Sequence, residues 1–452
     1  MKILYEDNHI IVVVKPVNIP VQADESGDGD LLSQVKAYIK EKYDKPGEVY
    51  CGLVHRLDRP VGGVMVFART SKAASRLMPQ FAEKNHAGAK KRYAAVVAGE
   101  APERGRLEDF ILRNDADHSS SIVPEGTDGA KRAVLEYERA AVKNGLSLLD
   151  VDLHTGRHHQ IRVQLKSAGF PIWGDQRYNP AAVPGQQIAL FAYSLSIEHP
   201  VLHERMTFTA LPEGGVWRAF SDEIKLVAAG LSPAYVDRDI AIIKKPAGVT
   251  VANADGGEAL EAKLASALGE AYPVHRLDAQ TTGLVIFARN GNAKAELDEA
   301  IRERRIRKYY RLIVKGRPEK SSGRLRFFAI KDPASALVKV LDAPRKGAVE
   351  MITDYRVAET KNGVSLIEAE LLTGRTHQIR ASFAHIGCPI LGDDKYGDRE
   401  FNRDPEYRPL HRKNSLCLAA VKLVFSFPDG AYLSRLDGLT VEADAPFGDR
   451  LR

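Results

Sequence analysis

Cysteine is scarce in this chain of 452 residues, and that scarcity excludes several kinds of site. The three cysteines, Cys51, Cys388 and Cys417, form no CxxC pair and are too scattered for a structural zinc or iron–sulfur site. An odd number of thiols also argues against a disulfide framework. The sequence therefore predicts a protein of the reducing cytoplasm that holds no metal ion.

Long apolar runs and phosphate-binding loops are missing as well. The apolar stretches, such as residues 10–14, fall far short of the roughly 20 residues that cross a bilayer. The first residues lack the basic and then apolar layout of a signal peptide. No G-x-G-x-x-G or Walker motif is present to hold a nucleotide. We therefore expect neither a membrane partner nor a cofactor.

The net charge of +6 is unevenly distributed along the chain. Residues 1–226 hold equal numbers of basic and acidic residues, so the excess lies in the second half. Part of it is concentrated in IRERRIRKYYR, residues 301–311. A polyanionic partner such as a nucleic acid is one interpretation. A solvated helix face followed by a strand explains the same charges equally well.

The sequence repeats itself at a spacing close to 220 residues. HRLD occurs at residues 55–58 and again at residues 275–278. Three further pairs follow in the same order: KKRYAAVVAG with RKYYRLIVKG, LSLLDVDLHTGRHHQIRVQ with VSLIEAELLTGRTHQIRAS, and GFPIWGDQRYN with GCPILGDDKYG. Co-ordered repeats of this kind indicate two homologous domains in tandem. We place them at residues 1–230 and 231–452, with the boundary after a short helix expected over residues 216–229.

Each copy has the pattern of a strand-rich α+β domain. Short apolar runs stopped by proline predict buried strands, and alternating segments predict half-buried ones. Helical spacing is limited to a few segments, such as residues 30–43 and 71–85. Because helices do not alternate regularly with strands, we expect a mixed, mainly antiparallel sheet with flanking helices in each domain. The pairs Gly62-Gly63 and Thr282-Gly283 are expected to serve only a turn.

The polar residues that recur in both copies suggest chemistry at a single carboxylate. Asp58 and Asp278 each follow an arginine by two positions. The repeated set holds one such carboxylate, one phenol, two guanidinium groups and one histidine, with no second acid in the same motif. Ordinary glycoside hydrolysis needs two carboxylates, and a metal site needs more ligands. One nucleophilic carboxylate suits a reaction at a glycosidic carbon or an electron-poor ring, although a structural ion pair also explains each aspartate.

The blocks HRLDAQTTGLVIFARN, KYYRLIVKG and LLTGRTHQIRASFAHIGCPILGDDKYG resemble the signature motifs of the RluA-type pseudouridine synthases. The first half carries the same blocks in the same order, so the resemblance covers nearly the whole chain. It implies two fused pseudouridine synthase-like domains that isomerise uridine to pseudouridine in structured ribosomal or transfer RNA. It also implies that the reaction uses neither a metal nor a cofactor.

The resemblance carries residue roles onto matching positions of this sequence. It implies a catalytic aspartate in HRLD, a tyrosine in K-x-Y, and an arginine that closes the HQIR segment, which we expect to be a strand. These catalytic residues are Asp58, Asp278, Tyr93, Tyr310, Arg162 and Arg380. Arg56 and Arg276 hold the position that enters the RNA helix as the target base leaves it. The full set of expected RNA contacts is Arg56, Arg276, Arg157, Arg375, His55, His275, Lys91 and Lys308. For Arg157 and Arg375, organisation of their loop is the alternative role.

The two copies differ near the expected catalytic aspartate. The second reads Thr281-Thr282-Gly283 where the first reads Val61-Gly62-Gly63, and His158 of the first is a threonine in the second. We expect both sites to be catalytic, because each keeps the aspartate, tyrosine and arginine. Two other functions remain open. One is an RNA-binding protein in which one or both sites are inactive, and the other is a nucleoside glycosidase that releases uracil.

Overall fold

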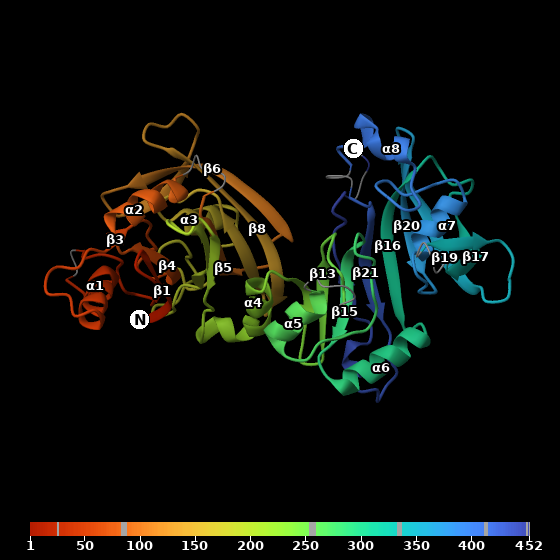
Figure 1. The fold of residues 1–452 in the computed structure, drawn as a ribbon, viewed down its shortest axis with the longest axis horizontal. Helices are drawn as coiled ribbons and strands as arrows, with labels where there is room; N and C mark the ends of the chain where they lie inside the picture. Colours follow the sequence, from red (N-terminus) through yellow and green to blue (C-terminus); the bar gives the residue numbers. More distant parts are fainter. Residues whose placement is uncertain are drawn as a thin grey trace. The chain divides into compact units, whose positions relative to one another are not determined.

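The computed structural model describes residues 1–24, 27–82, 88–252, 259–331, 337–410, 415–448 and 451. The chain divides into two compact units, Met1–Ala228 and Ala229–Arg452, close to the boundary expected from the repeat (Figure 1). Within the described ranges, no helix has the length and apolar character needed to cross a membrane.

The first unit is built on one large sheet. Its strands are β1 (Lys2–Glu6), β2 (Ile10–Lys15), β3 (Gly52–Leu53), β4 (Gly62–Ala68), β5 (Lys90–Ala98), β6 (Arg104–Asn114), β7 (Ser119–Val123), β8 (Lys131–Lys143), β9 (Leu146–Leu153), β10 (Leu190–Glu198) and β11 (Arg205–Thr209). They follow the order β1-β2-β4-β10-β5-β9-β8-β6-β7, with β3 beside β4 and β11 beside β10. The β4–β10 pair is parallel and the other strand pairs are antiparallel. The expected mixed, mainly antiparallel sheet is confirmed.

Helices flank this sheet where the sequence supplies caps and apolar faces. They are α1 (Leu31–Lys42), α2 (Ser71–Leu77), α3 (Gln160–Ser167) and α4 (Ser221–Ala228). Asp30 caps α1 and Thr70 caps α2, because each side chain accepts a hydrogen bond from a backbone N–H of the first turn. Helix α2 is shorter than expected from the spacing. A 3₁₀ turn with Pro79 near its start, Met78–Phe81, follows it, because proline cannot donate the next helical hydrogen bond.

The second unit repeats the plan. Its strands are β12 (Ser232–Val236), β13 (Ile240–Lys245), β14 (Tyr272–Pro273), β15 (Thr282–Ala288), β16 (Ile306–Lys315), β17 (Ser322–Lys331), β18 (Val338–Leu341), β19 (Val349–Lys361), β20 (Val364–Leu371), β21 (Leu418–Phe425) and β22 (Thr440–Glu442). The order β12-β13-β15-β21-β16-β20-β19-β17-β18 matches that of the first unit strand for strand, with β14 beside β15 and β22 beside β21. Its helices are α5 (Leu260–Leu268), α6 (Gly291–Arg302), α7 (Gln378–His385) and α8 (Arg399–Arg403).

The HQIR segment is helical in both units, so the expected strand is wrong. Its last three residues begin α3 and α7, and its first residue, His159 or His377, is the N-cap with a left-handed backbone and a φ of 53°. Four residues are too few to reveal helical spacing. A strand shortly before them, such as β9, therefore favours the prediction of an extended segment. In the first unit β9 ends at Leu153, bends and a turn follow over residues 154–159, and the helix begins directly after the left-handed histidine.

Gly63 and Gly283 do more than serve a turn, which corrects the sequence-based expectation. They lie where β4 runs parallel to β10 and β15 runs parallel to β21. Their φ values are 138° and 108°, and a Cβ atom on Gly63 would lie 2.3 Å from the carbonyl oxygen of Ala192. Glycine is therefore required by backbone conformation and by close approach of the neighbouring strand.

Replacing Gly63 by alanine is expected to destabilise the first unit by about 2–5 kcal/mol, since backbone strain and steric overlap combine. Gly99→Ala is the matched control. Gly99 also has a positive φ, 82°, but a Cβ there meets nothing within 4 Å. Gly99→Ala should lower the free energy of unfolding by only about 1–2 kcal/mol, from backbone strain alone. Urea denaturation measures both, and equal losses would contradict the close-approach explanation.

Candidate active site

The expected catalytic aspartates lie in a tight turn at the start of a buried strand. Asp58 follows β3 and its backbone carbonyl accepts a hydrogen bond from the Val61 N–H at 3.0 Å. Asp278 makes the same turn with Thr281, again at 3.0 Å. The turn holds the carboxylate at the head of β4 or β15, with the side chain partly exposed.

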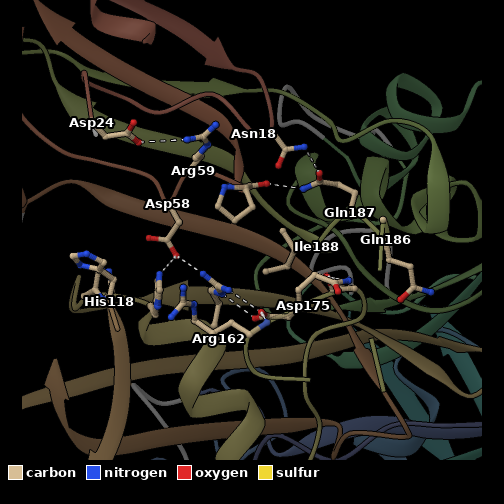
Figure 2. Close-up of a pocket in the computed structure, with 17 residues that line it drawn as sticks. Asn18, Asp24, Asp58, Arg59, His118, Arg162, Asp175, Gln186, Gln187 and Ile188 are labelled. Atoms are coloured by element: carbon tan, nitrogen blue, oxygen red, sulfur yellow. Dashed lines mark hydrogen bonds and ion pairs between the residues drawn. The ribbon is translucent and has the colours of Figure 1, made fainter. Parts of the chain in front are cut away.

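The arginine that closes HQIR reaches this aspartate in both units. Arg162 Nη1 on α3 lies 3.4 Å from Asp58 Oδ2, and Arg380 Nη1 on α7 lies 3.3 Å from Asp278 Oδ2. Both arginine side chains are almost fully buried, whereas the aspartates keep 28% and 29% of their side-chain surface exposed. Figure 2 shows the first of these pairs within its cleft. Each carboxylate is thus oriented by a buried arginine and remains partly exposed to solvent.

A second carboxylate, for which the sequence predicted no role, holds each arginine. Asp175 accepts from Arg162 Nε at 2.8 Å and from Nη2 at 2.7 Å, and Asp393 binds Arg380 with the same two distances. The expectation that the recurring set contains a single carboxylate is therefore corrected. Burial would raise the pKa of Asp393, but hydrogen bonds from Arg380 and from backbone N–H groups lower it on balance. Both oxygens of this second carboxylate are engaged in binding the arginine.

The expected tyrosines are buried beside the aspartates. Tyr93 lies on β5, between β9 and β10, and Tyr310 lies on β16 in the equivalent position. Burial raises the pKa of both phenols, and the negative charges of Asp58 and Asp278 raise it further. The phenols are therefore neutral at physiological pH, and each carries a proton close to its aspartate.

The Thr-Gly-Arg-x-His-Gln motif is explained by one side-chain amide. Gln160 Oε1 accepts from the Thr155 hydroxyl at 2.8 Å and from the Arg157 backbone N–H at 3.0 Å. The second unit repeats both contacts through Gln378. The Arg157 guanidinium donates to the Arg132 carbonyl, and its counterpart Arg375 donates to a carbonyl of β19. Of the two roles the sequence left open for these arginines, the contacts support organisation of the loop.

A buried lysine fixes the turn that carries each aspartate. Lys15 Nζ donates to the carbonyls of Arg59 and Val61 at 2.9 and 2.8 Å. Lys245 Nζ donates in the same way to the carbonyl of Ala279 at 2.8 Å. Burial lowers the pKa of both lysines to about 8, against the effect of the neighbouring aspartate. Lys15-Pro16 and Lys245-Pro246 occupy matching positions of the repeat, but this match predicted no role for either lysine.

The two histidines expected to contact RNA accept backbone hydrogen bonds. His55 Nε2 accepts from the Val66 N–H of β4 at 3.1 Å, and His275 Nε2 accepts from the Ile286 N–H of β15 at 3.3 Å. The His55 ring also stacks on Phe81, with 4.6 Å between centroids. Burial lowers the pKa of both histidines to about 3. These contacts support a structural role.

The buried histidines predict a loss of stability in acid. A histidine in the unfolded chain has a pKa near 6.5, whereas the pKa of His55 and of His275 in the folded protein is about 3. Between these two values the unfolded chain binds protons that the folded protein does not bind, which favours unfolding. Each should lower the free energy of unfolding by about 2 kcal/mol between pH 7.5 and pH 5. His55→Gln keeps an acceptor without titrating, and its denaturation midpoint should fall less over that range. An equal fall in both proteins would contradict this explanation.

The remaining expected RNA contacts lie nearer the surface. Arg56 and Arg276 are exposed, and Arg56 Nη2 donates to Gln22 Oε1 at 2.9 Å. Lys91 and Lys308 are partly buried, and burial lowers the pKa of Lys308. A Cβ on Gly156 would lie 3.5 Å from Lys91 Nζ, which places this lysine beside the Thr-Gly-Arg loop.

An open cleft of about 1180 Å³ adjoins the aspartate of the first unit (Figure 2). Basic and imidazole side chains gather around it: Arg59, His118, His158, His159, Arg162 and Arg177. Asp24, Asp58 and Asp175 line it as well, so the cleft is polar with charges of both signs, and its size suits a nucleotide. Across the described ranges, no three His, Cys, Asp or Glu side chains converge so as to hold a metal ion.

Comparison with known proteins identifies the family. The family model for RNA pseudouridylate synthase matches residues 9–167 and 239–385. The chain is 35% identical over 193 residues to ribosomal large subunit pseudouridine synthase C of Rickettsia conorii, covering 41% of this chain and 62% of that protein. It is 36% identical over 198 residues to an uncharacterized RNA pseudouridine synthase of Aquifex aeolicus, covering 41% and 62%.

The chain thus spans less than two thirds of the length of these relatives. Among solved structures, human RNA pseudouridylate synthase domain containing 4 matches with a TM-score of 0.40 and 23% identity, over 50% of this chain and 92% of that one. Since the family model covers well over half of the sequence, in two segments that correspond to the two units, this chain belongs to the RNA pseudouridylate synthase family.

Proposed function

We propose that the protein is an RNA pseudouridine synthase with a catalytic site in each half. The observation that carries this proposal is the repeated arrangement of Asp58 and Asp278. Each partly exposed carboxylate is held by a buried arginine, which a second carboxylate fixes in turn. Each also lies near enough to a buried tyrosine to raise the pKa of its phenol.

The proposed reaction begins with extrusion of the target uridine from its stack, which costs a few kcal/mol. Arg56 or Arg276 fills the vacated space, and basic side chains around the cleft bind phosphates. The ring of Tyr93 or Tyr310 offers a flat surface for the uracil, worth roughly 1–3 kcal/mol. The same phenol lies near the point where the proton must leave C5.

The aspartate acts on the extruded nucleotide by one of three routes. It attacks C1′ of the ribose, attacks the uracil ring, or removes a sugar proton to give a glycal. In each route uracil separates, turns, and rejoins the ribose through C5, so no atom is gained or lost overall. A site that excludes water favours this outcome over release of the base.

The second carboxylate separates this proposal from a nucleoside glycosidase. Hydrolysis would need an acid or base to activate water. Asp175 and Asp393 are fully buried, and both oxygens of each bind an arginine. They are therefore occupied as arginine ligands, and the catalytic aspartate works without a partner carboxylate.

The proposed substrate is structured RNA. Ribosomal RNA comes first because relatives with 31–35% identity carry the words ribosomal large subunit in their names, and transfer RNA remains the other candidate. We place the reaction in the cytoplasm, since Cys51, Cys388 and Cys417 are all buried free thiols.

The test uses the full chain and RNA labelled with tritium at C5 of uridine, taken from a strain that lacks the gene. Pseudouridine formation releases that tritium, and sequencing for pseudouridine should give defined positions that are absent without the protein. Release of free uracil would instead indicate a glycosidase. Tight RNA binding with no tritium release would indicate a binding protein and overturn the proposal.

A further inference from the structure

A chain of hydrogen bonds in the first unit ends at a histidine that faces the catalytic aspartate. The Ser120 backbone N–H donates to the Tyr178 hydroxyl at 2.8 Å, and that hydroxyl lies 2.8 Å from His159 Nδ1. The other ring nitrogen, His159 Nε2, faces Asp58 Oδ2 at 3.7 Å. The imidazole therefore connects the tyrosine to the carboxylate.

The second unit repeats the chain with different neighbours. The Val338 backbone N–H donates to the Tyr396 hydroxyl at 2.8 Å, which lies 2.9 Å from His377 Nδ1. His377 Nε2 faces Asp278 Oδ2 at 3.8 Å. In the first unit His158 stacks on His159 with 3.8 Å between ring centroids, whereas a threonine precedes His377. The arrangement is thus independent of that stacking partner.

The hydrogen bonds and the facing carboxylate together favour one tautomer of each histidine, because the other tautomer would direct the lone pair of Nε2 at that carboxylate. The tyrosine oxygen already accepts from a backbone N–H, so its own proton is free to point at the imidazole. Nδ1 is then an acceptor, and the ring proton of the neutral imidazole stands on Nε2. That N–H points at the catalytic carboxylate. Burial, opposed in part by the charge of Asp278, lowers the pKa of His377 and favours this neutral form.

The backbone also directs the ring toward the aspartate. His159 and His377 both adopt φ of 53°, a left-handed conformation that is uncommon outside glycine. Each is 10% exposed in its side chain and precedes the first turn of α3 or α7. The same left-handed backbone at the same position in both halves gives each imidazole the same direction, toward its aspartate.

The two carboxylate oxygens of each catalytic aspartate differ in their contacts. In both units the arginine and the histidine approach Oδ2. Among the described residues, no hydrogen bond reaches Oδ1 of either aspartate. We propose that His159 and His377 are positioning residues: each is fixed by its tyrosine and, with the arginine, holds Oδ2, so that Oδ1 is presented to the nucleotide. This inference rests on the proposed function.

The separations of 3.7 and 3.8 Å exceed a hydrogen bond. Catalytic hydrogen bonds are often long in the free enzyme and shorten when substrate binds. Closure onto the nucleotide would bring the Nε2–H within reach of Oδ2 in each half.

The test uses the second half of the full-length protein, with the first half silenced by Asp58→Asn. His377→Gln and His377→Met are a matched pair: both side chains are unbranched and similar in length, and both carry the same backbone strain. Only glutamine places an N–H donor near the position of Nε2. We expect the methionine variant to lose about 10- to 100-fold in kcat, with RNA affinity and melting temperature equal to those of the glutamine variant. The glutamine variant should recover most of that loss.

Tyr396→Phe gives a second, independent readout. It keeps the ring beside Arg380 but removes the hydroxyl that fixes His377. We expect about a fivefold loss in kcat, the effect of one hydrogen bond, and no further loss when it is added to His377→Met.

Equal kcat values for the glutamine and methionine variants would overturn the inference while leaving the proposed function intact. Additive losses for Tyr396→Phe and His377→Met would overturn the role of the tyrosine. The Asp58→Asn parent is measured alongside, and if it formed no pseudouridine, the function proposed for the second half would fail together with this inference.

Discussion

Replacing Asp278 by asparagine is expected to abolish pseudouridine at the position modified by the second half, by more than about a thousandfold. The amide has the shape of the carboxylate but is neither a nucleophile nor a base. Its oxygen still accepts from Arg380 Nη1, so the surrounding arrangement should persist. Asp278 is partly exposed, and folding should be nearly unaffected.

Asp58→Asn provides the reciprocal control for the first half. Each variant is incubated with RNA from a strain that lacks the gene, and pseudouridine is mapped position by position. Each variant should lack pseudouridine at the positions modified by its altered half and keep it at the positions modified by the other half. If one variant lost every position, the remaining half would be a binding module, contrary to our expectation that both sites are catalytic.

Replacing Asp393 by asparagine is expected to destabilise the second unit by about 3–5 kcal/mol and to lower its activity about 100-fold. The carboxylate is fully buried and binds Arg380 through both oxygens. An asparagine side chain replaces one acceptor oxygen with a donor, so the arginine keeps its charge but loses half of its pair. Arg380 would then turn toward Asp278 and draw it from its position.

Asp394→Asn is the matched control for that variant. Asp394 adjoins Asp393 in sequence and lies 3.3 Å from the same Arg380 Nη2, but its side chain is 72% exposed. Exposed pairs contribute little, so its loss should remain below about 1 kcal/mol. Urea denaturation and pseudouridine assays measure both variants. Similar losses for the two would contradict the assignment of Asp393 as the ligand that fixes the arginine.

Much of the fold was predictable from the sequence because the chain contains its own comparison. Two copies in one order indicate two domains, and the alternation of apolar residues in β9 and β20 indicates half-buried strands. The motifs also brought together Asp58, Tyr93 and Arg162, since each lies in a separate recurring block. Their proximity depends on the strand order, which no single block contains.

The features that the sequence missed are those that arise only from tertiary contact. Asp175 lies in a recurring Gly-Asp motif, but its role depends on an arginine one helix away. The requirement for glycine at position 63 comes from a neighbouring strand that lies more than a hundred residues later in the sequence. His55 appears exposed to RNA in the HRLD motif, yet the fold turns its ring onto a backbone N–H of β4. The presence of each residue in both copies indicated that it is needed, but the contact that requires it is visible only in the structure.

The most direct test of the central claim is the double variant Asp58→Asn with Asp278→Asn, assayed on RNA labelled with tritium at C5 of uridine. We predict wild-type affinity for the RNA, an unchanged melting temperature and no release of tritium, because neither half retains a carboxylate that acts on the nucleotide. Tritium release by this variant, at any position that the unaltered protein modifies, would contradict the account.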